Sequence, residues 1–496
     1  MTTDTSIFPD PVYKRTVLSP LFEGALAHFV NPVRFINQAH LVMLHETGIL
    51  NISSVKELAV ALTDIDESLD LASLQYTGEH EDYFFLVESE LRVRVGADKA
   101  GMLHTARSRN DMDHTVFKMV LKQKGAQFVA HALALCESML KKAQTERDTI
   151  IVAYTHGQPA QPTTYGHYLC AATEVLQRDI DRLQAAYKNL DHCPMGAAAI
   201  TTSGFPIDRD RMAELLGFSS PLLNSYGCIA SVDYITGWYS AVKLMFLHLG
   251  RVIQDMQFWS AFEVGQLYVP NSLVQISSIM PQKRNPVPVE HLRHLASVTC
   301  GRCDTIVNTM HNTPFTDMND SEGEVQQAGY AVYDSGSRVL ELLSALIEQC
   351  SINSERVKAT SNKACITITE LADTLVRQES LSFRQAHEIA ADTAKAVITK
   401  GRSLAEGFEL FEIAFRSQLG RDCGLSKVDY QTVVSAEHFV SVRDRVGGPS
   451  PRALDYALTH YQGTFDAQTT LAQTYINSQL LADNKLADAF LQLKGL

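Results

Sequence analysis

One short stretch, residues 277–286, combines reactive side chains within nine residues of one another, in the order S-S-I-M-P-Q-K-R-N-P. Lys283 and Asn285 could together hold a carboxylate, and one of the two serines could act as a base if its proton were stabilised elsewhere. The two prolines restrain the backbone around these groups. Composition alone favours a plainer interpretation, a surface turn with a solvated Lys-Arg pair.

Two other polar stretches carry groups of complementary chemistry. Residues 104–111 read H-T-A-R-S-R-N-D, and residues 154–162 read Y-T-H-G-Q-P-A-Q-P. An arginine fork suits recognition of a carboxylate, and a histidine suits proton transfer. Loops that are positioned by rigid elements are the usual place for such groups. The three stretches are therefore candidate parts of one active site.

The elements between these stretches are long helices. Apolar residues recur at three- and four-residue spacing over about 113–146, 164–190, 231–262, 288–310 and 326–348. Five such helices predict an all-α fold with a central bundle. We expect an elongated subunit of three domains: an N-terminal helical domain (1–112), the central bundle (113–366) and a C-terminal domain of shorter helices (367–496), interrupted by a loop at 446–451.

Composition limits the class of function. The net charge of −13 offers no broad basic field for nucleic acid or an anionic membrane surface. The first residues lack the pattern of a secretory signal, and no apolar run approaches the length needed to cross a bilayer, so we expect a cytoplasmic protein. Cys300 and Cys303 form a C-x-x-C within a helical stretch, and reduced cysteines are the favoured interpretation. The sequence calls for no metal, nucleotide or other cofactor.

The motifs identify a family. Residues 277–286 resemble the G-S-S-x-M-P-x-K-x-N-P loop of the fumarase/aspartase superfamily. Residues 104–111 are similar to the H-T-x-R-S-R-N-D segment of argininosuccinate lyases, and 155–162 to the family's T-H-x-Q-x-A-Q-P. Lesser resemblances, at 81–88, 196–209 and 439–451, follow in the family's order. They imply a fumarase/aspartase-like fold and a homotetramer whose sites are each built from three chains.

The resemblance also implies a reaction and a role for each motif residue. The family splits an N-substituted aspartate by β-elimination and releases fumarate, with no cofactor. Ser277 is then the base, His156 protonates or orients the departing nitrogen, Glu290 pairs with that histidine, and Lys283 stabilises the charge that accumulates on a carboxylate. The residues expected to bind the substrate are Ser108, Arg109, Asn110, Thr155, Gln158, Ser278, Met280 and Asn285.

Departures from the family pattern concern the amine half of the substrate. Alignment from Pro314 puts Asp317, Glu322 and Val325 where argininosuccinate lyases have a tyrosine, a glutamine and a lysine that grip arginine. Asp317 and Glu322 are therefore candidate substrate-binding residues, although a solvated acidic loop explains them equally well. Smaller departures are Ile276, Met112 and Val287.

Several functions remain open on these residues. The first is an argininosuccinate lyase of arginine biosynthesis. A second is a paralogue that eliminates fumarate from, or adds it to, a different amine. Adenylosuccinate-type activity is a third, because the sequences T-H-G-Q-P (155–159) and K-R-N-P (283–286) resemble those of adenylosuccinate lyases. A non-catalytic scaffold, like the lens crystallins, is the alternative of another class, and retention of Ser277, Lys283, Asn285 and His156 argues against it.

Overall fold

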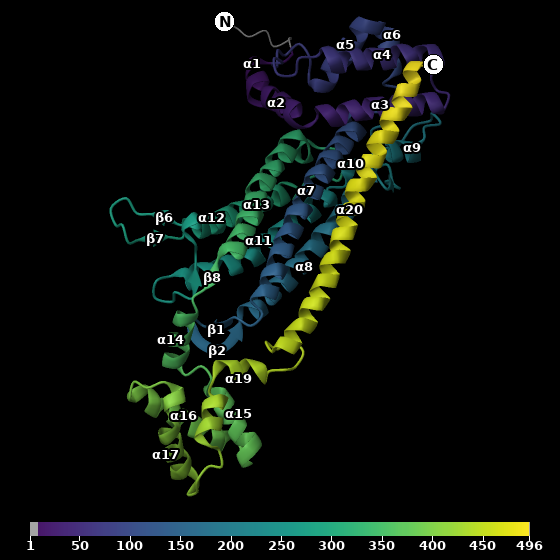
Figure 1. Ribbon diagram of the computed structural model, residues 1–496. Helices are drawn as coiled ribbons and strands as arrows, with labels where there is room; N and C mark the ends of the chain where they lie inside the picture. Colours follow the sequence, from purple (N-terminus) through teal and green to yellow (C-terminus); the bar gives the residue numbers. More distant parts are fainter. Residues whose placement is uncertain (1–7, 496) are drawn as a thin grey trace.

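The computed structural model describes residues 8–495, and the chain forms a long, narrow subunit (Figure 1). Short helices gather at the N-terminal end, long helices run along the middle, and a small group of helices lies at the opposite end. The N-terminal stretch that we interpreted as lacking a secretory signal lies partly in residues 1–7, outside the described residues. Within 8–495, no helix is long and apolar enough to cross a membrane.

The N-terminal end consists of short helices packed over the beginning of the bundle. Asn51 and Asp82 cap two of them, because each side chain accepts a hydrogen bond from a backbone N–H in the first turn. The elements are α1 (Pro11–Tyr13), the π-helical turn η1 (Lys14–Leu18), α2 (Ser19–His28), α3 (Val30–Glu46), α4 (Ile52–Ser68), α5 (Tyr83–Val95) and α6 (Ala97–Met102).

The five predicted long helices are present and form the central bundle, so the predicted all-α fold is confirmed. They are α7 (Arg109–Thr145), α8 (Tyr165–Leu190), α11 (Asp233–Ser260), α12 (Val287–Thr309) and α13 (Gly323–Gln349). Large aromatic side chains such as Trp238, Phe128 and Phe246 are fully buried between them. At Gly336 a Cβ atom would lie 2.9 Å from the Phe128 ring and 3.0 Å from the Phe246 ring. The missing side chain therefore lets α13 approach α7 and α11 closely.

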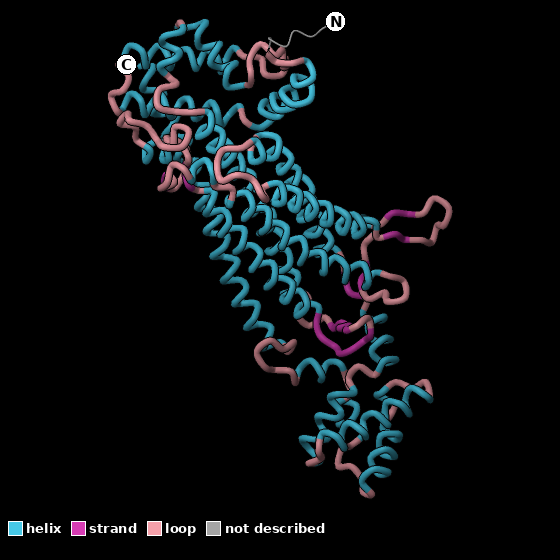
Figure 2. The backbone as a smooth tube through the Cα atoms, turned by 180° about the vertical axis from the view of Figure 1, so that it is seen from behind, coloured by secondary structure: helices cyan, strands magenta, loops and turns pink. Residues whose placement is uncertain are grey.

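Strands are few and occur in pairs at the ends of the helices (Figure 2). The pairs are β1 (Ile150–Thr155) with β2 (Gln158–Thr164), β3 (His192–Cys193) with β4 (Ser220–Pro221), β5 (Leu267–Tyr268) with β8 (Ser351–Ile352), and β6 (Gln275–Ile276) with β7 (Arg284–Asn285). Only β3 and β4 run parallel within the described residues. Short helical turns in the same connections are α9 (Arg209–Leu215), α10 (Gly227–Ala230), η2 (Asn271–Leu273) and η3 (Asn319–Ser321).

The group of helices at the opposite end has a hydrophobic core of its own. Phe411, Phe415 and Tyr430 are fully buried there, and the Tyr430 hydroxyl donates to the Leu404 carbonyl at 2.8 Å. The elements are α14 (Ser354–Ala364), α15 (Ile368–Glu379), α16 (Phe383–Thr399), η4 (Leu404–Glu406), α17 (Phe408–Leu419), α18 (Lys427–Val433) and α19 (Ala436–Ser441). The core is formed by residues 365–434, whereas Val357 of α14 packs on Val152 of β1, so α15–α18 are the part whose core is separate from that of the bundle.

The last helix differs from the prediction of short helices after residue 366. Helix α20 (Pro451–Gly495) has 45 residues and returns along the bundle to the N-terminal end (Figure 1). Polar contacts hold it there: Gln468 Nε2 donates to the Gln177 carbonyl, and Gln184 Nε2 donates to the Gln468 carbonyl, both at 2.8 Å. Its apolar stripe is sparse because glutamines and small residues make part of the contact, and the sequence pattern therefore missed it. The three-domain division remains a proposal, and residues 451–495 lie outside the core formed by α15–α18.

Candidate active site

The first predicted motif forms the beginning of α7. Ser108 is the N-cap residue: its hydroxyl accepts a hydrogen bond from the Asn110 N–H, and its own N–H donates to the Asp111 carboxylate at 2.8 Å. This reciprocal arrangement is a capping box, which follows from a serine and an acidic residue three positions later. It fixes the backbone of residues 108–110 at the end of a long, rigid helix.

Asp111 also ties this motif to a distant, glycine-bearing segment. Its second oxygen accepts hydrogen bonds from the N–H groups of Gly196, at 2.9 Å, and Ala198, at 3.0 Å. The side chain is fully buried, and burial raises its pKa although these donors act in the opposite direction. The lesser resemblance at 196–209 thus belongs to the same local structure as residues 104–111.

Arg109 and Asn110, which we expected to bind the succinyl carboxylates, contact carboxylates of this chain. Arg109 pairs with Glu81 at 2.9 Å and with Asp82 at 2.7 Å. Asn110 Nδ2 donates to Asp317 Oδ2 at 2.6 Å. The guanidinium and the amide are therefore oriented by acidic neighbours before any substrate binds.

The second motif is the β1–β2 hairpin, with His156 at its tip. Thr155 pairs with Gln158, so that His156 and Gly157 form a two-residue loop. Their φ angles are +55° and +73°, the combination that a type I′ turn requires. A left-handed histidine is uncommon, and strained backbone of this kind gathers at functional sites. The imidazole at this turn is exposed.

The third motif is the loop between β6 and β7, which begins with Ser277. Ser277 Oγ accepts hydrogen bonds from two backbone N–H groups, those of Met280 at 3.1 Å and Ile279 at 3.4 Å. Ser278 is exposed. Two donors directed at one hydroxyl oxygen favour negative charge on that oxygen. The contacts therefore distinguish Ser277 from Ser278, which the residue pattern alone could not do.

The rest of this loop is anchored by Arg284. Its guanidinium donates to the Val269 carbonyl at 2.7 Å and to Asn271 Oδ1 at 2.9 Å. Lys283 is exposed beside it, and its N–H donates to the Met280 carbonyl at 3.0 Å. The other predicted residues of this region are Asn285, in β7 and paired with Gln275, and Glu290, exposed in the first turn of α12.

The connection between α12 and α13 returns to the beginning of α7. Asp317 contacts Asn110, as described above, and its other oxygen lies 3.4 Å from His114 Nε2. His114 is 1% exposed. Burial, and then the neighbouring Asp317, raise the pKa of Glu322. Burial, and then Glu322, raise the pKa of Asp113 well above its ordinary value. Several carboxyl groups thus gather at this position, and burial disfavours their charged forms.

Within the described chain, the predicted site residues lie in three separate regions. The first holds Ser108, Arg109 and Asn110 with Asp317 and Glu322; the second, Thr155, His156 and Gln158; the third, Ser277, Ser278, Met280, Lys283 and Asn285, with Glu290 just beyond. Helix α7 separates the first place from the second by about 55 Å, at 1.5 Å per residue. Helix α12 separates the first from the third by about 35 Å by the same measure. Figure 1 shows the β6–β7 hairpin projecting from the side of the bundle, away from β1 and β2.

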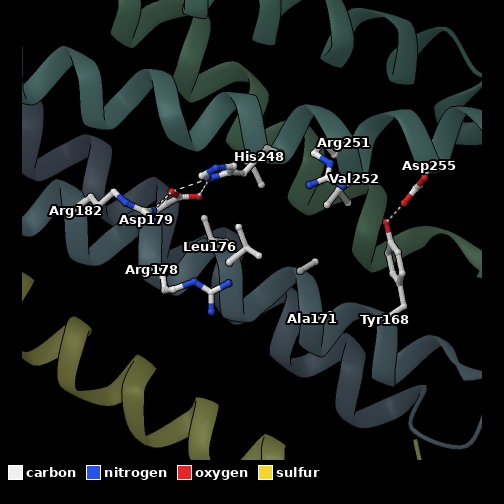
Figure 3. Close-up of a pocket in the computed structure, with 13 residues that line it drawn as sticks. Tyr168, Ala171, Leu176, Arg178, Asp179, Arg182, His248, Arg251, Val252 and Asp255 are labelled. Carbon is white, nitrogen blue, oxygen red and sulfur yellow. Dashed lines mark hydrogen bonds and ion pairs between the residues drawn. The ribbon is translucent and has the colours of Figure 1, made fainter. Parts of the chain in front are cut away.

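A groove of about 420 Å³ lies between α8 and α11 (Figure 3). Several of the polar groups that line it pair with one another: His248 Nδ1 lies 2.8 Å from Asp179, which also pairs with Arg182, and the Tyr168 hydroxyl donates to Asp255 at 2.8 Å. No predicted site residue lines this groove. We assign it no role in catalysis.

The residue pattern gave no role to Asp111, Asp113 or His114. Only Asp111 carried a local signal, the capping-box spacing from Ser108. Arg107, which we weighed as a brace for its loop, is buried and donates to Asn37 Oδ1 at 2.7 Å. His167, interpreted as structural, has partners at both ring nitrogens: Thr163 Oγ1 at 2.8 Å and the Gly447 carbonyl at 3.0 Å.

The amino-acid sequence of the chain is similar to those of known lyases. Residues 53–301 match the family described as lyase, and residues 365–440 match the argininosuccinate lyase C-terminal family. Argininosuccinate lyase 2 of Agrobacterium fabrum (strain C58) is 59% identical over 99% of this chain and 98% of its own length. Argininosuccinate lyase of Methanococcus maripaludis (strain C6) is 31% identical over 85% of this chain and 86% of its own length.

A solved structure shares the architecture as well. A variant of EDDS lyase with bound fumarate superposes with a TM-score of 0.84 and 27% sequence identity, covering 98% of this chain and 96% of that one. The likeness extends over the bundle and both ends of the subunit.

Proposed function

The chain belongs to the argininosuccinate lyase family of the fumarase/aspartase superfamily and is a carbon–nitrogen lyase, and we propose that it cleaves argininosuccinate to arginine and fumarate. The 59% identity over nearly the whole length of a named argininosuccinate lyase supports this substrate as the first candidate. The reaction would place the enzyme in arginine biosynthesis.

The observation that carries the proposed chemistry is the pair of backbone N–H groups at Ser277 Oγ. The proton beside a carboxylate is weakly acidic, so an ordinary serine is far too weak a base to remove it. A hydroxyl whose oxygen is held by donors, with the exposed Lys283 on the same loop, can act as an alkoxide. Ser277 is therefore the proposed base.

The elimination then proceeds with a balanced movement of electrons and protons. Ser277 Oγ takes the proton from the carbon next to one carboxylate of the succinyl group. The electron pair left behind forms the carbon–carbon double bond of fumarate, and the C–N bond breaks with its electrons on nitrogen. His156 supplies the proton that nitrogen requires, with Glu290 as its partner. Lys283 and Asn285 stabilise the carboxylate on which charge accumulates.

These roles require more than one copy of the chain. Helices of 37 and 23 residues hold the three motifs apart, and no side chain spans such a separation. We propose a homotetramer in which each site takes one motif from each of three copies, as the family resemblance implies. Ser108, Arg109, Asn110, Thr155, Gln158, Ser278 and Met280 would then surround one substrate.

A second candidate function is elimination from, or addition to, an amine other than arginine. Asp317 and Glu322 favour it, because acidic side chains stand at the positions that grip arginine in the family, and Val325 stands at the position of a lysine. The similar EDDS lyase indicates that the fold is not confined to argininosuccinate.

We also propose a cytoplasmic location. All nine cysteines lie among the described residues and are unpaired. Free thiols in this number are typical of a reducing compartment.

The deciding experiment follows fumarate by its ultraviolet absorbance after purified protein meets argininosuccinate. Saturable release, lost in Ser277→Ala, is the expected result. Failure with argininosuccinate but turnover with another N-substituted aspartate would select the second candidate. Failure with every such compound, and with fumarate plus amines in the reverse direction, would contradict lyase activity.

A further inference from the structure

One side chain, that of Arg284, joins the β6–β7 hairpin to the rest of the chain. Its guanidinium donates to the Val269 carbonyl at 2.7 Å and to Asn271 Oδ1 at 2.9 Å. The same group lies over the Tyr268 ring, 4.6 Å from the ring centroid. Within the described chain, these two hydrogen bonds are the only ones that link residues 275–285 to residues outside the hairpin. Arg284 therefore fixes how the hairpin is oriented on the bundle.

The register of the hairpin shows what this anchor controls. The last ladder pair is Ile276 with Arg284, in an antiparallel arrangement. The next two positions in the same register are Ser277 and Lys283, the proposed base and the cation proposed to act beside it. Opposite positions of an antiparallel pair share one face, and neighbouring residues along a strand alternate between faces. The register therefore brings Ser277 and Lys283 opposite each other where the loop begins, on the face away from the contacts of Arg284.

The other residue of the last ladder pair contributes little to this orientation. Ile276 stands where the family loop has glycine, and its side chain is 78% exposed, so little of it packs on other parts of the described chain. Isoleucine is also confined to fewer backbone conformations than glycine. The beginning of the loop should therefore turn together with β7, in a direction that depends on the side-chain contacts of Arg284.

We propose that Arg284 is a positioning residue for the elimination, because its contacts with residues 268–271 keep Lys283 opposite Ser277 while the proton is removed. This inference rests on the proposed lyase function. It gives a role to a position that the K-x-N-P part of the family motif leaves open. The guanidinium acts through Ser277 and Lys283 and does not touch the substrate, since its own contacts hold it on the opposite face of the hairpin.

Arg284→Lys keeps the positive charge and loses the planar fork that makes these contacts. The kcat of fumarate release should fall about tenfold or more, because a displaced base loses its alignment with the substrate proton. KM should change much less, since most groups proposed to bind the succinyl carboxylates belong to other motifs. The acidic limb of the pH profile of kcat should move to higher pH by about one unit, because Lys283 would favour the ionised form of Ser277 less strongly.

A second substitution tests the same contact from its other side. Asn271→Ala removes the Oδ1 acceptor and should lower kcat in the wild type, yet have little further effect in Arg284→Lys, because the two residues act through one contact. Arg402→Lys, at an exposed arginine between α16 and η4, is the control and should match the wild type. Fully additive effects, or a fall in kcat with no shift of the pH profile, would overturn the proposal.

Hydrogen exchange, measured on the assembled protein, tests the anchor without turnover. In Arg284→Lys, the amides of Ile279 and Met280, which donate to Ser277 Oγ, should exchange faster, whereas the amides of α12 should not change. Urea unfolding and native mass should match the wild type. Unchanged exchange in the loop, or a general loss of stability, would overturn the proposal. A wild type that releases no fumarate would contradict the proposed function, and exchange would still decide whether Arg284 holds the loop.

Discussion

The side chain of Gln266 satisfies both backbone hydrogen-bonding groups of Val152, 114 residues away in the sequence. Its Oε1 accepts from the Val152 N–H at 2.8 Å, and its Nε2 donates to the Val152 carbonyl at 3.3 Å. Both residues are buried. The side-chain amide of Gln266 thus forms the two hydrogen bonds that a neighbouring strand would form with Val152 of β1. It fixes the hairpin that carries His156.

Gln266→Ala should destabilise the protein and reduce its activity. The buried N–H of Val152 would lose its partner, at a cost of about 1–3 kcal/mol. Urea unfolding measures the loss, and fumarate release should fall because His156 is less well positioned. Gln473→Ala, on an exposed face of α20, is the control. Unchanged stability in Gln266→Ala would show that the hairpin does not depend on this contact.

Ser277→Ala and Ser278→Ala should separate the base from its neighbour. Ser277 accepts two backbone hydrogen bonds, whereas Ser278 is exposed, so only the first substitution should remove the base. We expect kcat to fall about 10²- to 10⁴-fold in Ser277→Ala. A much smaller loss is expected in Ser278→Ala. Near wild-type activity in Ser277→Ala, measured by fumarate absorbance, would refute its assignment.

Substitutions at the tip of the β1–β2 hairpin should separate chemistry from backbone conformation. Asparagine tolerates the left-handed conformation of His156, so His156→Asn should keep the turn and lose the proton donor. We expect unchanged thermal stability and a kcat reduced about 100-fold or more.

Gly157→Ala is the complementary variant. No atom lies within 4 Å of the added Cβ, so its cost is confined to backbone strain at a φ of +73°. We expect a loss of about 1 kcal/mol of stability, with His156 retained. If Gly157→Ala lowered kcat as strongly as His156→Asn, the turn rather than the imidazole would be the important feature.

Two inactive variants should restore activity when their subunits are exchanged. If Ser277 and His156 of one site come from different copies, mixing Ser277→Ala with His156→Asn creates some sites that carry neither substitution. About a quarter of wild-type activity is expected after random exchange. Native mass spectrometry verifies the exchange. Mixed assemblies without activity would show that one copy supplies both residues.

Stability should decline in mild acid because of His40. The ring is buried, its Nε2 contacts the Thr105 carbonyl at 2.9 Å, and its Nδ1 has no partner within the described chain. Burial lowers the pKa of His40 to about 3, from 6.5. The unfolded chain therefore binds a proton below about pH 6.5 that the folded protein does not, so stability falls as the pH falls through this range.

Between pH 7 and pH 5 this single group should contribute a loss of about 2 kcal/mol. Urea unfolding at both pH values measures it. His40→Gln keeps a donor without titrating and should have a flatter pH dependence than the wild type. His311→Gln, at an exposed histidine, is the control and should retain the wild-type slope. Equal slopes for wild type and His40→Gln would contradict the prediction.

The long helices could be predicted from the sequence, whereas the contacts between distant residues could not. The five bundle helices keep an uninterrupted apolar spacing, which is a strong signal. Helix α20 lacks it, because Gln468 and its partners supply polar contacts that periodicity does not detect. The family motifs predicted Ser277 and His156 as site residues. The hydrogen bonds of Ser277 and the backbone conformation of His156 depend on turn geometry, which the motifs do not specify.

The cluster of acidic side chains at the beginning of α7 was only partly predictable. Asp317 and Glu322 could be singled out in the sequence because they differ from the residues that argininosuccinate lyases have at these positions. Asp113 and His114 lie within a helix where polar side chains are unremarkable in the sequence, and their importance comes from residues about 200 positions away. Contacts of that range follow from the packing of α7 against α13, not from local propensity.

Helix α20 has a consequence for how the chain acquires its structure during synthesis. It packs on α7 and α8 and on α3 and α4, so residues 451–495 complete contacts with helices that are synthesised long before them. A nascent chain lacking them exposes apolar surface such as that met by Leu454, Leu486 and Phe490. Helices α3 and α4 must therefore remain partly uncovered until α20 has been synthesised, and a premature stop near residue 450 would release a subunit that cannot finish folding.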